Sequence, residues 1–163
     1  MNVSELFTMQ QELDRYIEEG HQLVEKDLFD QKVLALLVEV SELANETRCF
    51  KFWSTKGPSP QEVILEEYVD GLHFILSLGI EVGFHRTMKD VPSFKEAVEP
   101  VEQFLRVYEA IHQFRKEKCL SVYEHLLSEY LALGKIYGFT PEGIYKAYVA
   151  KNKVNFQRQQ QGY

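Results

Sequence analysis

Apolar residues recur every three or four positions along almost the whole chain, and this spacing places them on one face of successive α-helices. In the first stretch this face comprises Leu6, Met9, Leu13, Tyr16 and Ile17. Alternating apolar and polar residues bounded by turn residues, the pattern of strands, are missing. With their capping residues included, the predicted helices cover residues 3–26, 30–49, 59–82, 93–118, 121–138 and 140–158. The pattern therefore predicts an all-α bundle of about six helices joined by short turns.

Polar residues mark where several of these helices begin. Ser59 and Ser93 are each followed by a Glu three positions later, which is the pattern of a capping box. Asp30 is the predicted N-cap of the second helix, Ser121 opens the fifth, and Thr140 caps the sixth. No repeat, low-complexity linker or shift in composition divides the chain.

Length, charge and cysteine content narrow the class of protein. A chain of 163 residues suggests a single domain, 1–163, and 45% apolar residues suffice for a core. A net charge of −7 argues against a nucleic-acid polymer on a broad basic surface, but it allows a small phosphorylated ligand bound through metal ions. Cys49 and Cys119 lack C-x-x-C spacing, so we expect reduced thiols in a cytoplasmic protein. The polar N-terminus predicts no signal peptide, and the most apolar run, 74–80, is too short to span a membrane.

A narrow arc of acids interrupts each of two otherwise apolar helices. The acids are Glu39, Glu42 and Glu46 in the second helix and Glu66, Glu67 and Asp70 in the third. No Lys or Arg occurs in residues 33–47 or 57–85, whereas a solvated acidic face normally mixes both signs. Two unit charges about 4 Å apart repel by roughly 4 kcal/mol at an effective dielectric near 20. If the two helices are antiparallel, hard cations such as Mg²⁺ or Mn²⁺ could sit between the acids; a solvated acidic face is the alternative.

A stripe of polar residues on the last helix offers groups that bind a polyphosphate. Tyr148, Lys151, Asn155 and Arg158 fall at i, i+3, i+7 and i+10, and therefore on one face. Arg binds phosphate oxygens through its planar fork, and Lys binds them as a point charge. Cations near a helix C-terminus also suit the helix dipole, which is the alternative explanation.

Three weaker signals could complete a nucleotide pocket. Trp53 lies in a loop beside the acidic helix, where a base could stack on it while Lys51 reaches a phosphate; it could equally be a hydrophobic plug beneath the turn. Gln11 and Asp14, at i and i+3, could read a base edge or form a polar helix flank. The remaining candidates are His73 and Phe74, one turn beyond the acids of the third helix, where the histidine could instead be a core residue.

Together these stretches resemble the dimeric all-α dUTPase family, which is part of the MazG-like nucleoside triphosphate pyrophosphatases. The family's metal signature, E-x-x-E followed by E-x-x-D, matches Glu39-x-x-Glu42 and Glu67-x-x-Asp70. Further matching segments are Gln11-x-x-Asp14, NETRCFKFWS, EEYVDGLHFILSLG and the terminal run from Lys151 to Tyr163. The resemblance spans nearly the whole chain and implies a helical bundle with a four-helix metal-binding core.

The resemblance implies hydrolysis of dUTP to dUMP and pyrophosphate, in which water activated by Mg²⁺, or by Mn²⁺ as a substitute, attacks the α-phosphorus. Its implied metal ligands are Glu39, Glu42, Glu67 and Asp70. Glu39 or Glu42 would accept the proton of the water, and Glu46 and Glu66 would be neighbours of the site. The expected substrate-binding residues are Gln11, Asp14, Lys51, Trp53, His73, Phe74, Lys151, Asn155, Arg158 and Tyr163. A homodimer is expected, since family members borrow site residues across their interface.

One departure from the family pattern concerns specificity. The first-helix pair is often Gln-x-x-Asn, whereas the second member here is Asp14. An ionised carboxylate only accepts hydrogen bonds, so Asp14 would suit N3–H of uracil and equally the N4 amino group of cytosine. A pyrophosphatase that prefers dCTP or acts on several dNTPs is therefore the alternative enzyme. A non-catalytic helical dimer that binds metal structurally is the alternative from another class.

Overall fold

Helices make up the regular structure of the part of the chain that the computed structural model describes, residues 2–88, 96 and 98–162. The elements are α1 (Val3–Gly20), α2 (Phe29–Thr47), α3 (Gln61–Glu81), the short 3₁₀ helix η1 (Phe84–Arg86), α4 (Pro100–Lys116), α5 (Leu120–Ile136) and α6 (Pro141–Gln160). No strand occurs among these residues. The predicted all-α class is confirmed.

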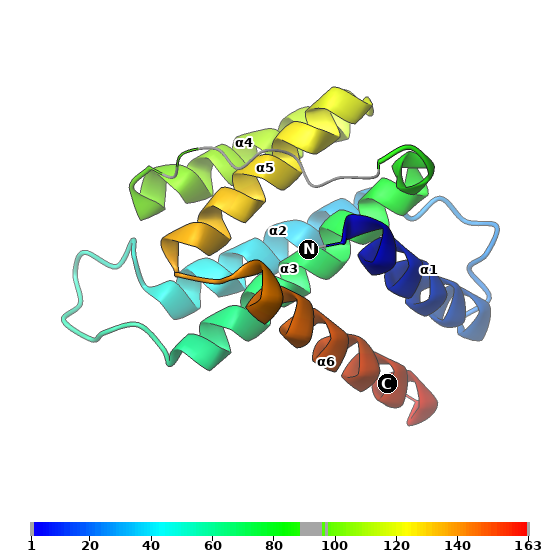
Figure 1. Cartoon of the computed structure of the whole chain (residues 1–163), viewed down its shortest axis with the longest axis horizontal. Coiled ribbons are helices and arrows are strands. Elements are labelled where there is room, and N and C mark those ends of the chain that lie inside the picture. The colour runs from blue at the N-terminus through cyan, green and yellow to red at the C-terminus, as the bar shows by residue number, and fades with distance from the viewer. Residues whose placement is uncertain (1, 89–95, 97, 163) are drawn as a thin grey trace.

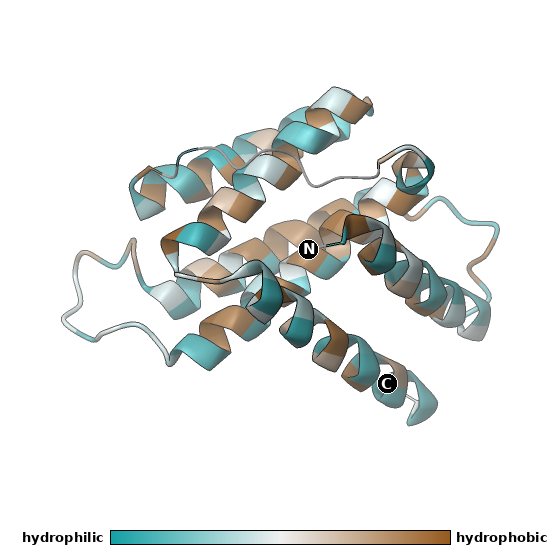
Figure 2. Cartoon of the chain, viewed as in Figure 1, coloured by the Kyte–Doolittle hydropathy of each residue, from teal (hydrophilic) through white to brown (hydrophobic). Residues whose placement is uncertain are grey.

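The two helices that carry the acids lie at the centre of the molecule. Figure 1 shows α2 and α3 side by side and antiparallel, with the α4–α5 pair on one side and α1 and α6 on the other. Much of this central pair is hydrophobic in Figure 2. The buried positions of α2 include Val33, Leu36, Val40 and Leu43, which are at most 3% exposed. This packing fixes α2 and α3 relative to each other, and with them the acids that the two helices carry.

Close packing around α3 depends on a glycine that faces a tyrosine. A Cβ atom built on Gly71 would lie 2.2 Å from the hydroxyl oxygen of Tyr130 on α5. That hydroxyl donates to the backbone oxygen of Tyr68 at 2.7 Å, and the Tyr68 hydroxyl donates to the backbone oxygen of Tyr130 at 3.3 Å. The two rings stack with their centroids 4.7 Å apart. This pair holds α5 against the segment of α3 that carries Glu67 and Asp70.

The first helix is shorter than the sequence pattern predicts. It ends at Gly20 instead of residue 26, and Gln22 just beyond it has a positive φ of 59°. Glycine is a poor helix former, and the residues that follow offer no buried face, since Val24 is 61% exposed. Without an apolar stripe, nothing packs a further turn against the bundle.

The predicted capping residues have mixed outcomes. Thr140 caps α6 as expected, because its side chain accepts from the backbone N–H of Gly143 at 3.1 Å. Asp30 was the wrong choice, since Leu28 occupies the N-cap of α2 and Asp30 lies in its first turn. Ser59 is also not a cap: its hydroxyl donates to the carboxylate of Glu46 and thereby ties the loop before α3 to α2.

The fourth and fifth helices begin at residues other than those predicted. α4 begins at Pro100, which suits a first helical position because proline has no N–H to leave unsatisfied there. The predicted cap Ser93 lies outside the described residues. α5 begins at Leu120, so Ser121 falls inside the helix and Cys119 is the N-cap. The expectation of reduced cysteines is confirmed, since Cys49 and Cys119 both carry free thiols.

Candidate active site

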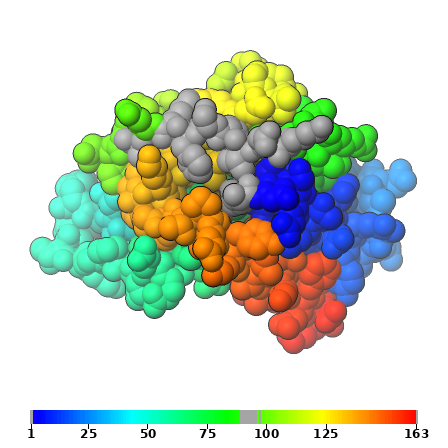
Figure 3. Space-filling view, in the orientation of Figure 1, coloured from blue at the N-terminus to red at the C-terminus, as the bar shows by residue number. Residues whose placement is uncertain are grey.

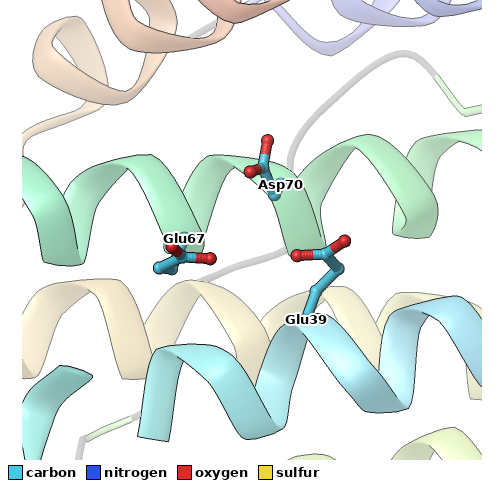
Figure 4. A group of neighbouring side chains, drawn as sticks. All are labelled: Glu39, Glu67 and Asp70. Carbon is cyan, nitrogen blue, oxygen red and sulfur yellow. The ribbon is translucent and has the colours of Figure 1, made fainter. Parts of the chain in front are cut away.

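Three carboxylates from the central helices converge on one point. Glu39 projects from α2, and Glu67 and Asp70 project from α3 one turn apart (Figure 4). One carboxylate oxygen from each of the three lies within 4.8 Å of the other two. All three side chains are half-buried. The antiparallel α2–α3 pair therefore brings Glu39 of the first part of the acidic motif beside Glu67 and Asp70 of the second part.

The three carboxylates of this cluster repel one another when ionised, and their pKa values are raised. Burial, followed by the charges of Asp70, Glu42 and Glu67, raises the pKa of Glu39 to about 7. Burial and neighbouring carboxylates also raise the pKa values of Glu67 and Asp70. A bound cation would reverse these shifts, because it stabilises the ionised form of each carboxylate. The donors are hard oxygen atoms with no His or Cys among them, which is the ligand set that Mg²⁺ and Mn²⁺ prefer.

A lysine from α6 offsets part of the negative charge. The Lys151 ammonium lies 2.6 Å from Asp70 Oδ2 and 2.8 Å from Glu66 Oε1, and its side chain is only 10% exposed. The hydrogen bond from Lys151 lowers the pKa of Glu66, whereas the pKa of Glu67 is raised. Glu66 thus points to the α6 side, and Glu67 is the member of the adjacent pair that joins the carboxylate cluster. Residues 33–47 and 57–85 contain no Lys or Arg, so the cation beside the cluster comes from a distant part of the sequence.

A cavity of about 350 Å³ opens beside the cluster, between helices α1, α3 and α6. Figure 3 shows the surfaces of α1 and α6 adjoining at this side of the molecule. Its lining residues are Gln10, Leu13, Asp14, Ile17, Glu39, Asp70, His73, Phe74, Ser77, Lys151, Asn155, Arg158 and Gln159. This volume is within the range of small-molecule sites, and the lining combines acids, cations, an aromatic ring and aliphatic side chains.

The structure brings most of the predicted substrate-binding residues to this cavity. The predicted residues that line it are Asp14, His73, Phe74, Lys151, Asn155 and Arg158, together with the acids Glu39 and Asp70. They come from α1, α2, α3 and α6, so the agreement depends on how these four helices pack together. Glu42 is exposed on α2, one turn from Glu39, and lies outside the group of three converging carboxylates. Tyr163 lies outside the described residues.

Other predicted residues lie away from the cavity in this chain. Trp53 is 64% exposed in the loop between α2 and α3, where its ring meets Phe50 and Phe52 edge-on. Lys51 in the same loop donates to the side-chain oxygen of Asn45. Glu46 is held by Ser59 at that end of α2. None of these side chains lines the cavity.

Gln10 faces the cavity from α1 together with Asp14, whereas Gln11, which the sequence predicted there, is exposed. Gln11 Nε2 lies 3.5 Å from His85 Nε2, on the other flank of α1. Gln10 Nε2 donates to Asp14 Oδ1 at 2.8 Å. The sequence held a signal for this setting. Gln10 lies four residues after Leu6, three before Leu13 and seven before Ile17, which places it on the apolar face of α1.

Asp14 is fixed by donors from three helices. Besides Gln10, the Ser77 hydroxyl on α3 donates to Asp14 Oδ2 at 2.6 Å, and the Lys32 ammonium on α2 lies 4.0 Å from that oxygen. Burial raises the pKa of Asp14, and the hydrogen bond from Ser77 and the charge of Lys32 oppose the rise. Sequence reasoning missed Ser77 and Lys32, because their contacts with Asp14 depend on how α1 packs against α3 and α2.

The fold and this arrangement define a class: an all-helical protein in which converging carboxylates adjoin a cation-lined cavity, as a metal-assisted reaction on a phosphorylated substrate requires. Residues 2–163 match the model of a protein family described as dUTPase. The chain belongs to this dUTPase family and is a dUTP diphosphatase. The match covers all three helices that form the cavity. A search of curated proteins finds no match.

Among the described residues, no helix combines the length and the apolar composition that crossing a bilayer requires.

Proposed function

We propose that the chain hydrolyses dUTP to dUMP and pyrophosphate at the α2–α3 carboxylate cluster, with a divalent cation, Mg²⁺ by preference, as cofactor. The observation that carries this proposal is the convergence of Glu39, Glu67 and Asp70 within 4.8 Å at the edge of a cavity of about 350 Å³. Membership of the dUTPase family supplies the substrate. The cluster supplies a place where the phosphates and the reacting water can meet.

The metal would be held by Glu39, Glu67 and Asp70, with Glu42 close enough on α2 to join them. Their oxygens suit Mg²⁺, and Mn²⁺ would substitute because it prefers the same donors. When bound, the cation would neutralise phosphate charge and make a water molecule easier to deprotonate. Glu39 and Glu42 are the candidates to accept the proton of that water as its oxygen attacks the α-phosphorus.

The residues of α6 would bind the phosphates and the sugar. Lys151 pairs with Asp70 and Glu66. Binding of a triphosphate together with a cation would replace these ion pairs. The ammonium would then move to phosphate oxygens while Asp70 turns to the cation. Arg158 and Asn155 lie further along the same helix face and line the cavity. Arg158 would engage phosphate through its planar fork.

The far end of the cavity would hold the base. Leu13, Ile17 and Phe74 give it apolar walls, and Asp14 gives it a polar one. Because Asp14 accepts hydrogen bonds, a second candidate function is hydrolysis of dCTP, whose N4 amino group is a donor. Both Asp14 oxygens already accept from Gln10 and Ser77, so a base donor would share an oxygen with one of them.

A homodimer is part of the proposal, and an apolar surface on α2 and α4 supports it. Leu34, Val38, Val101 and Leu105 are between 43% and 64% exposed on these two helices. Val101 and Leu105, together with Phe50, Phe104 and Tyr108, line an apolar depression of about 260 Å³. A second copy would cover this surface. The exposed loop with Lys51 and Trp53 adjoins it, so the proposed dimer would bring these residues to the partner's cavity.

A panel of dNTPs tests the proposed reaction. Each dNTP is incubated with the protein and Mg²⁺, and release of pyrophosphate and the corresponding monophosphate is followed. We expect dUTP to be hydrolysed fastest, and chelation of the metal to stop the reaction. Preference for dCTP would support the second candidate, and in that case Asp14→Asn should restore preference for dUTP. Release of orthophosphate in place of pyrophosphate would contradict attack at the α-phosphorus.

A further inference from the structure

A buried hydrogen-bond network lies behind the cavity and joins α1, α3 and α6. The side chains of Gln10, His73 and Tyr148 are 3%, 5% and 0% exposed. The Tyr148 hydroxyl donates to Gln10 Oε1 at 2.6 Å, and His73 Nδ1 lies 2.7 Å from the same oxygen. The His73 ring also stacks on the Tyr148 ring, with centroids 4.1 Å apart and planes inclined by 19°. The histidine is therefore held from two sides.

These contacts settle which nitrogen of His73 carries a proton. The Gln10 amide nitrogen faces Asp14, because only its N–H can donate to that carboxylate. The Gln10 amide oxygen therefore faces His73 and acts only as an acceptor. His73 Nδ1 must donate to it, so Nδ1 bears the proton. Burial, with a further contribution from the charge of Lys151, lowers the pKa of His73 to about 3, so the ring is neutral. Nε2 is left with a lone pair.

That lone pair is buried and has no partner among the described residues. His73 Nε2 lies within the protein without a hydrogen bond, and His73 is one of the residues that line the cavity. Buried acceptors in folded proteins almost always have a donor. A donor on a ligand in the cavity would complete the network, whereas a ligand atom that only accepts would be repelled.

The position of His73 along α3 indicates which part of a nucleotide it meets. Asp70, His73 and Ser77 face the cavity on successive turns, and each turn advances about 5.4 Å. Asp70 belongs to the carboxylate cluster where the phosphates would lie. Ser77 holds Asp14 at the other end, where the base would lie. In a nucleotide the sugar connects the two, so the middle turn faces the sugar.

We propose that His73 Nε2 accepts a hydrogen bond from the 3′-hydroxyl of the substrate's deoxyribose, and that Gln10 and Tyr148 are positioning residues that fix the tautomer and the plane of the ring. The inference rests on the proposed function, since it takes the substrate and its direction in the cavity from there. It makes the histidine a group that recognises the sugar, with no part in the bond-breaking step.

Binding of a non-hydrolysable substrate measures this contact without turnover. Calorimetry of the wild-type protein with Mg²⁺ compares α,β-imido-dUTP with the same compound lacking the 3′-hydroxyl. We expect the loss of the hydroxyl to weaken binding by roughly 10-fold or more, because the buried acceptor would again lack a donor. Equal affinity for the two compounds would overturn the inference. Binding of neither compound would instead refute the proposed function, and the inference with it.

Two substitutions of the histidine assign the effect to Nε2. His73→Gln places an amide near the position of Nε2 and so can still offer an acceptor, whereas His73→Asn places its amide near Nδ1 and leaves no acceptor there. We expect His73→Gln to retain much of the preference for the 3′-hydroxyl and His73→Asn to bind both compounds within about twofold. Thermal unfolding identifies any variant that fails to fold. A folded His73→Asn variant with the full wild-type preference would contradict the proposal.

A base-modified analogue separates the sugar from the base. If His73 met the uracil N3–H instead, methylation of N3 would weaken binding in the wild-type protein, and His73→Asn would remove that penalty. This outcome would overturn the 3′-hydroxyl assignment. For the positioning role, Tyr148→Phe keeps the stacked ring but removes the hydroxyl that donates to Gln10. We expect it to lower the preference for the 3′-hydroxyl and shift the His73 ring ¹⁵N resonances, while Mg²⁺ binding is unchanged; unmoved resonances would contradict that role.

Discussion

At the scale of single residues, Glu39 holds its proton to a higher pH than a glutamate in water. Its pKa rises from 4.5 to about 7 on folding, because burial and the nearby carboxylates disfavour the charged form. The folded state therefore binds this proton more tightly than the unfolded state. Ionisation of Glu39 costs stability progressively as pH rises from about 4.5 to about 7, and the loss persists above that range.

The first prediction follows from this loss of stability with rising pH. Without metal, Glu39→Gln should make the protein more stable at pH 8 than the wild type and remove part of the decline in stability between pH 5 and pH 8. Urea unfolding in the presence of a chelator measures both. Added Mg²⁺ should raise the stability of the wild type at pH 8 more than that of the variant, because the cation binds the folded state through Glu39. A variant whose stability falls with pH as steeply as that of the wild type would contradict this role of Glu39.

Sequence spacing could predict which residues share one face of a helix, but it could not predict which residues of other helices contact them. Glu67 and Asp70 had to lie on one face of α3, since a helix is rigid over one turn. Whether Gln10 or Gln11 faces the cavity depends on how α1 is rotated about its own axis in the bundle. The identities of two neighbouring glutamines do not determine that rotation. The pairing of Lys151 with Asp70 depended on the docking of α6, a contact between residues 81 positions apart.

At the scale of elements, hydrophobic spacing predicted the helices because each needs a continuous buried stripe. Their ends were harder to predict. Ser59 has the sequence pattern of a cap, yet its hydroxyl bonds to Glu46 on α2. A polar side chain at a helix end can serve either the helix or a neighbouring element, and only the folded chain decides which. For Trp53 the sequence suggested stacking on a base, but helix spacing cannot predict where a loop residue lies relative to the cavity.

The second prediction concerns the packing of α5 against α3. Gly71→Ala should destabilise the fold by about 1–3 kcal/mol, because the added methyl group would collide with Tyr130 and disturb its hydrogen bond to Tyr68. Gly20→Ala is the matched control, since no atom lies within 4 Å of a Cβ there. The control should be neutral or slightly stabilising. Urea unfolding of both variants tests this, and equal stability of the two would contradict the close approach.

At the scale of the whole molecule, the proposed homodimer would form through the exposed apolar residues of α2 and α4. The third prediction is that Leu105→Glu converts a dimer to a monomer, because the charge would be buried at the interface without a partner. Val24→Glu is the control, since Val24 is 61% exposed in the loop between α1 and α2 and is not one of the residues that define that surface. Sedimentation velocity gives the mass of each. A Leu105→Glu protein that stays dimeric would place the interface elsewhere.

Loss of the dimer should also affect the reaction if Lys51 and Trp53 serve the partner's cavity. Activity of the Leu105→Glu monomer should then fall with an increase in KM, while Mg²⁺ binding to the carboxylates of each chain persists. A fully active monomer would show that one chain supplies the whole site.

The central claim is that the carboxylates converging between α2 and α3 form the metal-dependent catalytic centre. Two adjacent glutamates test it most directly, since Glu67 belongs to the cluster and Glu66 pairs with Lys151 outside it. The measurement is pyrophosphate release from dUTP as Mg²⁺ is titrated. We predict that Glu67→Gln lowers turnover by at least about 100-fold and weakens the Mg²⁺ response, while Glu66→Gln stays within about 10-fold of the wild type. Wild-type turnover and an unchanged Mg²⁺ response in Glu67→Gln would contradict the claim.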